Sequence, residues 1–136
     1  MQNLKSKPAE RLLRQFLEGY NKRDLAYIRN LCLPNIQMLG VAVDGCLVGL
    51  KEVEAQFEIN WSQSEKSSID VMHCIPGSSD ALWTAALCTA KFTIKDQQHI
   101  LENFRCTLAV EKQDDTWKIA HVHASFPEVR TNEINI

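Results

Sequence analysis

The chain has 136 residues, of which 45% are hydrophobic and 24% are charged, and its net charge at pH 7 is −2. This length suits one globular domain with a single core, and the balanced charge gives no basic face for nucleic acid. No window approaches the ~18 apolar residues of a membrane span. The N-terminus lacks the pattern of a signal peptide, so we expect a cytoplasmic protein without nucleic-acid or membrane partners.

Two helices are predicted in the first third of the chain. Over residues 7–24, apolar side chains recur at helical spacing and form one stripe; its members are Leu12, Leu13, Phe16, Leu17 and Tyr20. Asp24 is typical of a helix N-cap and predicts a short second helix over residues 25–32. Pro34 cannot continue that helix, so the helix should end before it.

A hairpin and a third helix are predicted next. Residues 36–50 are rich in strand-forming residues around Asp44-Gly45, a sequence that favours a tight β-turn. Helical spacing returns over residues 49–65. The apolar side of this helix consists of Leu50, Val53, Phe57 and Trp61.

Four strands are predicted after Ser67, separated by turn residues, over residues 68–75, 81–94, 99–112 and 116–126. Short connections favour an antiparallel meander. The order of elements indicates an α+β fold, with the N-terminal helices packed on one face of a curved, mostly antiparallel sheet. A ligand pocket is expected between the helices and the sheet.

The five cysteines are scattered through the chain at Cys32, Cys46, Cys74, Cys88 and Cys106. Their number is odd and none forms a C-x-x-C pair, which disfavours a disulfide framework or a thiolate zinc cluster. Most lie inside apolar runs. We therefore expect buried thiols in a reducing compartment.

Two stretches resemble a known superfamily. "LRQFLEGYNKRDLAYIRNLC", with its N-x-x-D-L turn, is similar to the opening of nuclear transport factor 2-like proteins. "RCTLAVEKQDDTWKIAHVHASFP" is similar to the ending of the SnoaL-like domains of that superfamily, and also to the association domain of calcium/calmodulin-dependent kinases. The resemblance covers residues 8–127, which we interpret as a single SnoaL-like domain with tails at 1–7 and 128–136.

This resemblance implies a cone-shaped α+β fold with a pocket at its wide end and a homodimer formed through the sheet. It implies no single function. The ketosteroid isomerases of the superfamily use a tyrosine hydroxyl and a carboxylate base, and their pattern puts Phe16 and Gly40 at these two positions. Neither residue can supply the donor or the base, and the nearby Asp44 fits a turn. Steroid isomerase chemistry is therefore disfavoured.

His121 and His123 stand two residues apart in the last predicted strand, so they share one of its faces. Strict alternation puts Trp117, Ile119 and Ser125 on that face and Ala120, Val122 and Ala124 on the other. Trp117 and Ile119 suit the core. We therefore expect the histidines inside the pocket and the small residues at a dimer interface, unless a β-bulge reverses the final residues.

A metal site would need a third ligand beside the two histidines, from His73 or Asp70. An H-x-H pair without an acidic neighbour is a weak pattern, and Asp70 and His73 point to opposite faces of a regular strand. We predict no metal and no cofactor.

Three further residues are candidates for the pocket. Arg105 suits bidentate recognition of a carboxylate, which would make the ligand anionic; it equally fits an ion pair on a solvated or dimer-facing surface. Trp61 and Trp83 could wall the cavity or could be ordinary core residues. The alternatives stay open at this level.

The sequence predicts a dimerising, non-catalytic module that binds a small organic molecule; the ligand-binding candidates are His121, His123, Arg105, Trp61, Trp83 and Ser125. One alternative is an isomerase, dehydratase or cyclase that uses His121 or His123 as general acid/base. Another is a structural oligomerisation domain. A histidine or carboxylate inside the cavity would favour the enzyme, whereas an apolar cavity with a few convergent donors would favour the binding module.

Overall fold

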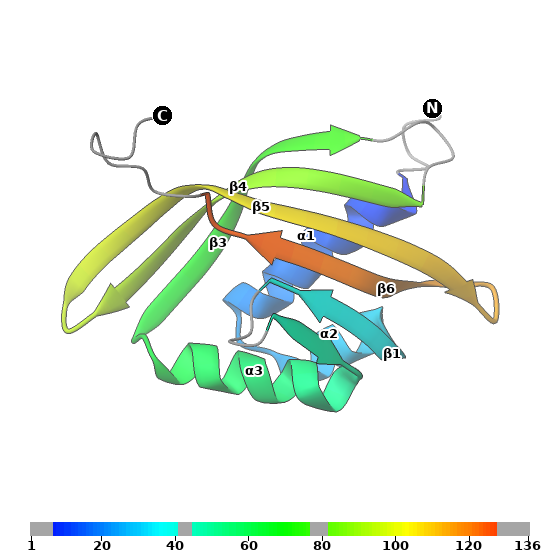
Figure 1. Ribbon diagram of the computed structural model, residues 1–136, viewed down its shortest axis with the longest axis horizontal. Helices are drawn as coiled ribbons and strands as arrows, with labels where there is room; N and C mark the ends of the chain where they lie inside the picture. The colour runs from blue at the N-terminus through cyan, green and yellow to red at the C-terminus, as the bar shows by residue number, and fades with distance from the viewer. Residues whose placement is uncertain (1–6, 41–44, 77–81, 128–136) are drawn as a thin grey trace.

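The computed structural model describes residues 7–40, 45–76 and 82–127. Its elements in chain order are α1 Pro8–Asn21, α2 Leu25–Leu31, β1 Cys32–Leu39, β2 Cys46–Val48, α3 Leu50–Ser62, β3 Lys66–Pro76, β4 Trp83–Ile94, β5 Gln97–Gln113 and β6 Thr116–Ser125. The helices lie along one side of a strongly curved sheet (Figure 1). This arrangement confirms the predicted α+β class and the mostly antiparallel sheet.

The helices form where the apolar spacing predicts them. In α1, Leu13 and Phe16 are 0% and 3% exposed, because the stripe of this helix packs against the sheet. Asp24 caps α2 by accepting a hydrogen bond from the backbone N–H of Tyr27 at 3.0 Å, an interaction worth ~1 kcal/mol. Pro34 lies inside β1, since the chain already turns into a strand at Cys32. No helix among the described residues is long and apolar enough to cross a membrane.

The sheet has the strand order β2-β1-β6-β5-β4-β3. Strands β3 to β6 form the predicted antiparallel meander. Strand β1 pairs with β2 in the antiparallel sense, and β6 pairs with β1 in the parallel sense. The β1–β6 pair joins distant parts of the chain, which local sequence patterns do not predict. Asp44, in the predicted turn between β1 and β2, lies outside the described residues.

Register shifts interrupt four ladders of the sheet: one lies in the parallel β1–β6 pair, between Cys32 and Gln37, and three lie in the antiparallel meander. Met72 of β3 has no partner on β4, and β5 has an additional residue near Asn103, which adopts a φ of 62°. The third shift leaves Ala120 of β6 unpaired, because Ile119 pairs with Val110 and His121 pairs with Ala109. Bulges increase local bend and twist, so these positions help to curve the sheet around the helices.

The bulge at Ala120 reverses the predicted faces of β6 beyond Ile119. Val122 and Ala124 face the core, at 1% and 5% exposure. His121 and His123 instead face the outer surface, and His123 is exposed. The prediction that the histidines point inward and the small residues outward is therefore wrong, because one unpaired residue shifts the alternation by one position.

Three of the cysteines are buried, as their apolar neighbours predict. Cys32, Cys88 and Cys106 are at most 5% exposed, and all five thiols are free. Burial raises the pKa of Cys32 and Cys106 to about 12 and that of Cys88 to about 11. Since thiolates are the reactive form, these thiols act as small apolar side chains. Cys46, in contrast, is exposed.

Candidate functional site

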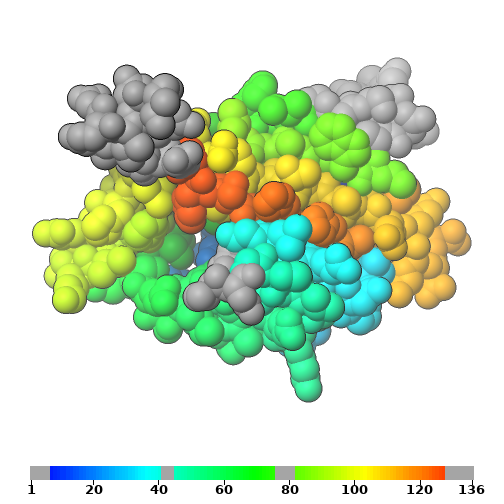
Figure 2. All heavy atoms as spheres, in the orientation of Figure 1, coloured from blue at the N-terminus to red at the C-terminus, as the bar shows by residue number. Residues whose placement is uncertain are grey.

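A cavity of about 320 Å³ lies between the helices and the inner face of the sheet. Small-molecule sites typically occupy ~300–1,000 Å³. The cavity is lined from α1 by Phe16, Leu17 and Tyr20, from α3 by Phe57 and Asn60, and from the sheet by Met38, Ile69, Ala90, Phe92, Phe104, Cys106, Val122 and Ala124, among others. Figure 2 shows a hollow beside the end of β6, with atoms of the N-terminal part of the chain (blue) visible at its floor.

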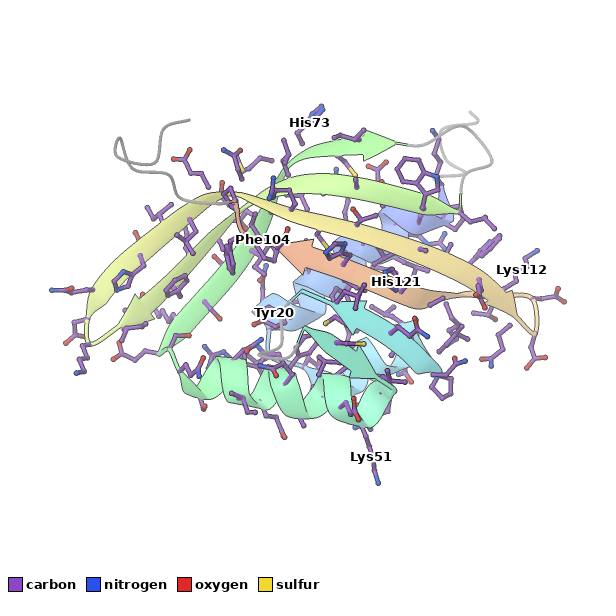
Figure 3. All side chains as sticks on the ribbon, viewed as in Figure 1. Tyr20, Lys51, His73, Phe104, Lys112 and His121 are labelled. Carbon is purple, nitrogen blue, oxygen red and sulfur yellow. The ribbon has the colours of Figure 1, made fainter. Side chains whose placement is uncertain are left out.

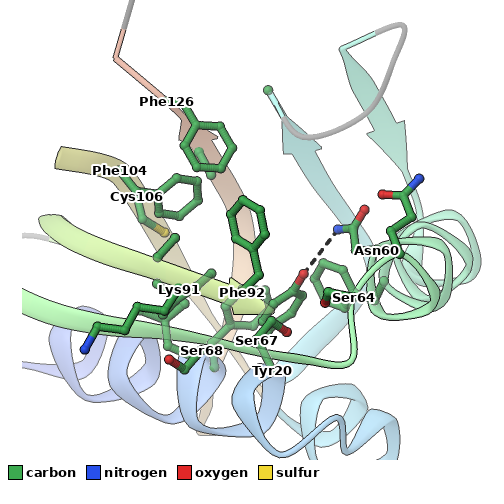
Figure 4. A pocket seen from close by; sticks show the side chains of 18 of the residues that line it. Tyr20, Asn60, Ser64, Ser67, Ser68, Lys91, Phe92, Phe104, Cys106 and Phe126 are labelled. Atoms are coloured by element: carbon green, nitrogen blue, oxygen red, sulfur yellow. Dashed lines mark hydrogen bonds between the residues drawn. The ribbon is translucent and has the colours of Figure 1, made fainter. Parts of the chain in front are cut away.

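The lining is mostly apolar and carries little charge. Among the described residues that line the cavity there is no Asp, Glu, His or Arg. The titratable lining residues are Tyr20, Lys91 and Cys106. The amine of Lys91 points away from Tyr20 (Figure 4), and burial keeps Cys106 a neutral thiol. The interior therefore suits a neutral, apolar molecule.

Tyr20 and Asn60 form a polar pair inside this apolar lining. Asn60 Nδ2 donates a hydrogen bond to Tyr20 Oη at 3.3 Å (Figure 4). The Tyr20 ring packs edge-on against Phe57 with ring centroids 4.9 Å apart, and its centroid lies 5.4 Å from that of Trp61. Burial raises the pKa of Tyr20, so the hydroxyl keeps its proton at neutral pH and can donate it.

Arg23 holds two lining residues of the cavity in place. It has a φ of 56° in the turn after α1, and its guanidinium donates to Trp61 O at 2.9 Å, to Ser64 O and Oγ at 3.2 and 3.3 Å and to Ser67 Oγ at 3.3 Å. Both serines line the cavity. The guanidinium is thus engaged with the protein, and its role is structural.

Gly40, at the end of β1, lines the cavity where no side chain fits. Its φ is 96°, and a Cβ atom built on it would lie 1.9 Å from the carbonyl oxygen of Ala124. Gly40 is also the residue that the resemblance matches to the isomerase base. The backbone of β6 occupies the space in which such a side chain would begin, so the fold itself excludes a carboxylate at this position.

Arg105 lies outside the cavity, on the outer face of β5 opposite Ser125. Its Nη2 donates to the backbone oxygen of Phe126 at 3.5 Å. The Phe126 ring packs on Phe104 with centroids 4.7 Å apart and lines the cavity. Arg105 thus reaches the cavity only through the backbone of a lining residue, and the cavity itself offers no guanidinium to an anionic ligand.

The other candidates on the outer face are also separate from the cavity. His121, His123 and Ser125 project from the outer side of β6. Trp83 is 48% exposed on the same side of β4, opposite Ala109. None of these four candidates is a lining residue. The structure therefore brings them together with Arg105 on the outer face of the sheet.

Trp61 lies behind the cavity wall. It is 8% exposed and packs on Tyr20 and Phe57, two residues that do line the cavity. Within the described structure its indole N–H is buried without a hydrogen-bond partner. Leaving such a group unpaired costs ~1–3 kcal/mol, so the packing of the ring outweighs the cost of its polar atom.

The described residues do not assemble a metal site. No three side chains of His, Cys, Asp or Glu among them are grouped closely enough to hold a metal ion. His73 pairs with Leu87 in β3, with β4 and β5 between it and β6, and it projects away from the body of the domain (Figure 3). It is therefore not a third ligand for the histidines of β6.

Sequence reasoning placed Tyr20 in the stripe of α1 but missed its role, and it missed Asn60 altogether. A signal was available, because Tyr20 follows Phe16 by one helical turn and so lies on the same face. Likewise, Gln56 and Asn60 are one turn apart on α3 and are hydrogen-bonded at 2.9 Å. Polar groups at the end of an apolar stripe mark where a buried face can meet a cavity.

A family model described as the SnoaL-like domain matches residues 9–128. The chain belongs to the SnoaL-like domain family. The match confirms the predicted resemblance to the SnoaL-like domains. Comparison with curated protein sequences gave no significant match.

Solved structures show the fold of this SnoaL-like domain. RV0760c from Mycobacterium tuberculosis, in complex with estradiol-17beta-hemisuccinate, aligns with a TM-score of 0.74 and 14% identity over 90% of this chain and 95% of that chain. A computationally designed 17-OHP binder aligns with a TM-score of 0.73 and 15% identity, over 90% of this chain and 95% of that chain. An NTF2-like protein of unknown function from Pseudomonas putida KT2440 aligns with a TM-score of 0.65 and 16% identity, over 87% of this chain and 83% of that chain. The SnoaL-like domain therefore has the NTF2-like fold.

Proposed function

We propose that this SnoaL-like domain binds a small, neutral, largely apolar organic molecule in its cavity without transforming it. The observation that carries this proposal is the cavity itself: about 320 Å³, mostly apolar, with the hydrogen-bonded pair Tyr20 and Asn60 and with no histidine or carboxylate among its described lining residues. Proton transfer needs a base within hydrogen-bond reach of the substrate. An apolar pocket with a few placed donors suits binding.

Two of the similar structures support this proposal by analogy of fold. RV0760c was solved with estradiol-17beta-hemisuccinate, and another is a designed binder of 17-OHP. The enzyme alternative required His121 or His123 at the cavity. Since the bulge at Ala120 directs both imidazoles to the outer face, binding is the better-supported function.

Methyl NMR with a neutral bicyclic probe, such as 2-acetylnaphthalene, tests the proposal. We expect shifts for the lining methyl groups of Leu17 and Val122, and none for Val48 and Ile75, which are exposed on the other face of the sheet. Absence of shifts at the lining methyls up to millimolar probe, or equal shifts at all four residues, would contradict cavity binding.

A matched pair of variants controls the same experiment. Ala90→Leu places a larger side chain in the cavity wall, so it should weaken probe binding. Ala26→Leu makes the same change at an exposed position of α2 and should leave binding unchanged. Equal affinity in the two variants would mean that the probe binds somewhere else.

We also propose that two copies pair through the outer face of the sheet. The register places Val48, Gln37, His121, Ala109 and Trp83 in one row across this face. Val48 and Trp83 are 56% and 48% exposed at opposite ends of the row. Large exposed apolar side chains on a sheet face favour an interaction site, and a two-fold pair would use the same row of residues on both copies.

We propose the cytoplasm as the compartment of the protein. All five cysteines are free thiols, and Cys46 is exposed to solvent. Oxidising compartments favour disulfides, whereas the cytosol keeps thiols reduced. The supporting observation is therefore the set of unpaired thiols.

A further inference from the structure

A directed chain of hydrogen bonds runs from α3 to the cavity. Gln56 Nε2 donates to Asn60 Oδ1 at 2.9 Å, and Asn60 Nδ2 donates to Tyr20 Oη at 3.3 Å. Gln56 and Asn60 are one turn apart on α3, while Tyr20 belongs to α1. The chain therefore crosses between the two helices and ends on the hydroxyl group of Tyr20, which lines the cavity.

The direction of this chain decides what Tyr20 offers to a ligand. The amide oxygen of Asn60 is occupied by Gln56, so its NH₂ group is the part that meets Tyr20. The phenol oxygen thus accepts a hydrogen bond, and its own hydrogen needs a different acceptor. Among the hydrogen bonds of the described residues, Tyr20 Oη donates none to the protein. Its O–H is a free donor at the cavity.

The surroundings of Tyr20 also restrict the charge of the ligand group that can accept a hydrogen bond from its hydroxyl. No described Arg or His lines the cavity, and the amine of Lys91 points away from Tyr20. Burial raises the pKa of Tyr20 and the positive charge of Arg23 offsets part of this rise, but the guanidinium is already hydrogen-bonded to Trp61, Ser64 and Ser67. An anion here would be buried without a partner, which is costly. A neutral oxygen acceptor carries no such cost.

From this geometry we propose that the ligand is a neutral carbonyl compound, such as a ketone, aldehyde or quinone, whose oxygen accepts a hydrogen bond from the hydroxyl of Tyr20. The inference rests on the proposed ligand binding in the cavity and names its chemical class. Donation from Asn60 polarises the phenol and makes its O–H a stronger donor. Tyr20 is thus an anchor for the carbonyl group, while Phe16, Phe57 and Phe104 contact the apolar body.

Two probes of the same shape test the inference: 2-acetylnaphthalene, which has a carbonyl acceptor, and 2-ethylnaphthalene, which has none. The wild-type protein should bind the ketone about two- to tenfold more tightly, the range expected for one neutral hydrogen bond. Tyr20→Phe keeps the ring and should remove this preference. Tyr27→Phe, which removes a hydroxyl bonded to Glu18 on the surface, should retain it.

Asn60→Asp tests the direction of the hydrogen bonds that run from Gln56 through Asn60 to Tyr20. A carboxylate only accepts hydrogen bonds, so it should capture the Tyr20 hydrogen and turn it away from the cavity. The ketone preference should then disappear although Tyr20 is still present. A preference that persists in Asn60→Asp would overturn the directed chain.

The infrared carbonyl stretch of the bound ketone gives a readout on the wild-type protein that requires no variant to fold. We expect a shift to lower frequency relative to the ketone in an apolar solvent. Equal affinities for the two probes together with an unshifted stretch would overturn this inference and leave cavity binding intact. If neither probe binds, both this inference and the proposed function fail.

Discussion

The inner and outer faces of the sheet are made by the same strands and differ sharply in what they present. On the inner face, Phe104 and Val122 are 5% and 1% exposed and line the cavity. On the outer face, Arg105, His123 and Trp83 are exposed. Because residues alternate between the faces, a shift of one position exchanges the two sets. Register therefore decides which residues of this domain can meet a ligand.

The bulge at Ala120 decides which residues of β6 face the core and which face the outer surface. Val122→Asp puts a carboxylate at a position that is 1% exposed, and burying this charge without a partner should cost more than about 5 kcal/mol, enough to abolish folding. His123→Asp is the matched control and should fold, because His123 is exposed on the opposite face. Circular dichroism and urea denaturation measure this effect. A stably folded Val122→Asp beside an unfolded His123→Asp would contradict the assignment of the faces.

Gly40 gives the next largest expected effect, because it allows β1 to approach β6 closely. Gly40→Ala combines an unfavourable φ with a contact of 1.9 Å to Ala124 O, so we expect a loss of about 2–4 kcal/mol in the free energy of unfolding. Gly45→Ala is the matched control, since Gly45 also has a positive φ of 84° but no atom of the described residues within 4 Å of the added carbon. Equal losses in urea denaturation would mean that backbone strain alone explains the effect.

Trp83 tests the outer face as an interface between two copies. Trp83→Glu replaces an exposed aromatic side chain of the row across this face by a charge and should raise the dimer dissociation constant by about 30-fold or more, as expected for an aromatic side chain that carries much of the binding energy, while leaving the cavity unchanged. Sedimentation equilibrium measures this constant. Ile59→Glu, at a position of α3 that is 51% exposed, should have no effect. A wild-type protein that is monomeric would refute the proposed pair.

Two variants of Trp61 separate the stabilisation from packing of its ring and the cost of its buried, unpaired indole N–H. Trp61→Phe removes an N–H that has no partner within the described structure, which offsets part of the lost packing, so we expect a change below about 1 kcal/mol. Trp61→Ala should cost about 3–5 kcal/mol. Thermal and urea denaturation give both values. A loss of several kcal/mol in Trp61→Phe would show that the N–H is satisfied in solution.

The smallest effect is expected for the two histidines. Replacing both His121 and His123 by alanine should change the affinity of the cavity for 2-acetylnaphthalene by less than about twofold, because both side chains project from the face of β6 opposite the cavity. Titration calorimetry measures this affinity. A large loss would restore the sequence-based assignment of these histidines to the site.

Sequence patterns predicted the elements better than they predicted the site. Each helix and each strand of the meander lies within a few residues of its predicted position. These features depend on periodicity over a few neighbouring residues, which a sequence displays directly.

The sequence by itself determined the α+β class, the order of the elements, the family and the absence of a usable side chain at Gly40. Only the tertiary structure decided the parallel β1–β6 pair, the bulge at Ala120 and the meeting of Tyr20 with Asn60. The physical reason is that apolar spacing is local, whereas register shifts and contacts between helices depend on how distant segments pack. One unpaired alanine moved two histidines from the expected pocket to the outer face, and packing of α1 against α3 built the polar group that the cavity presents.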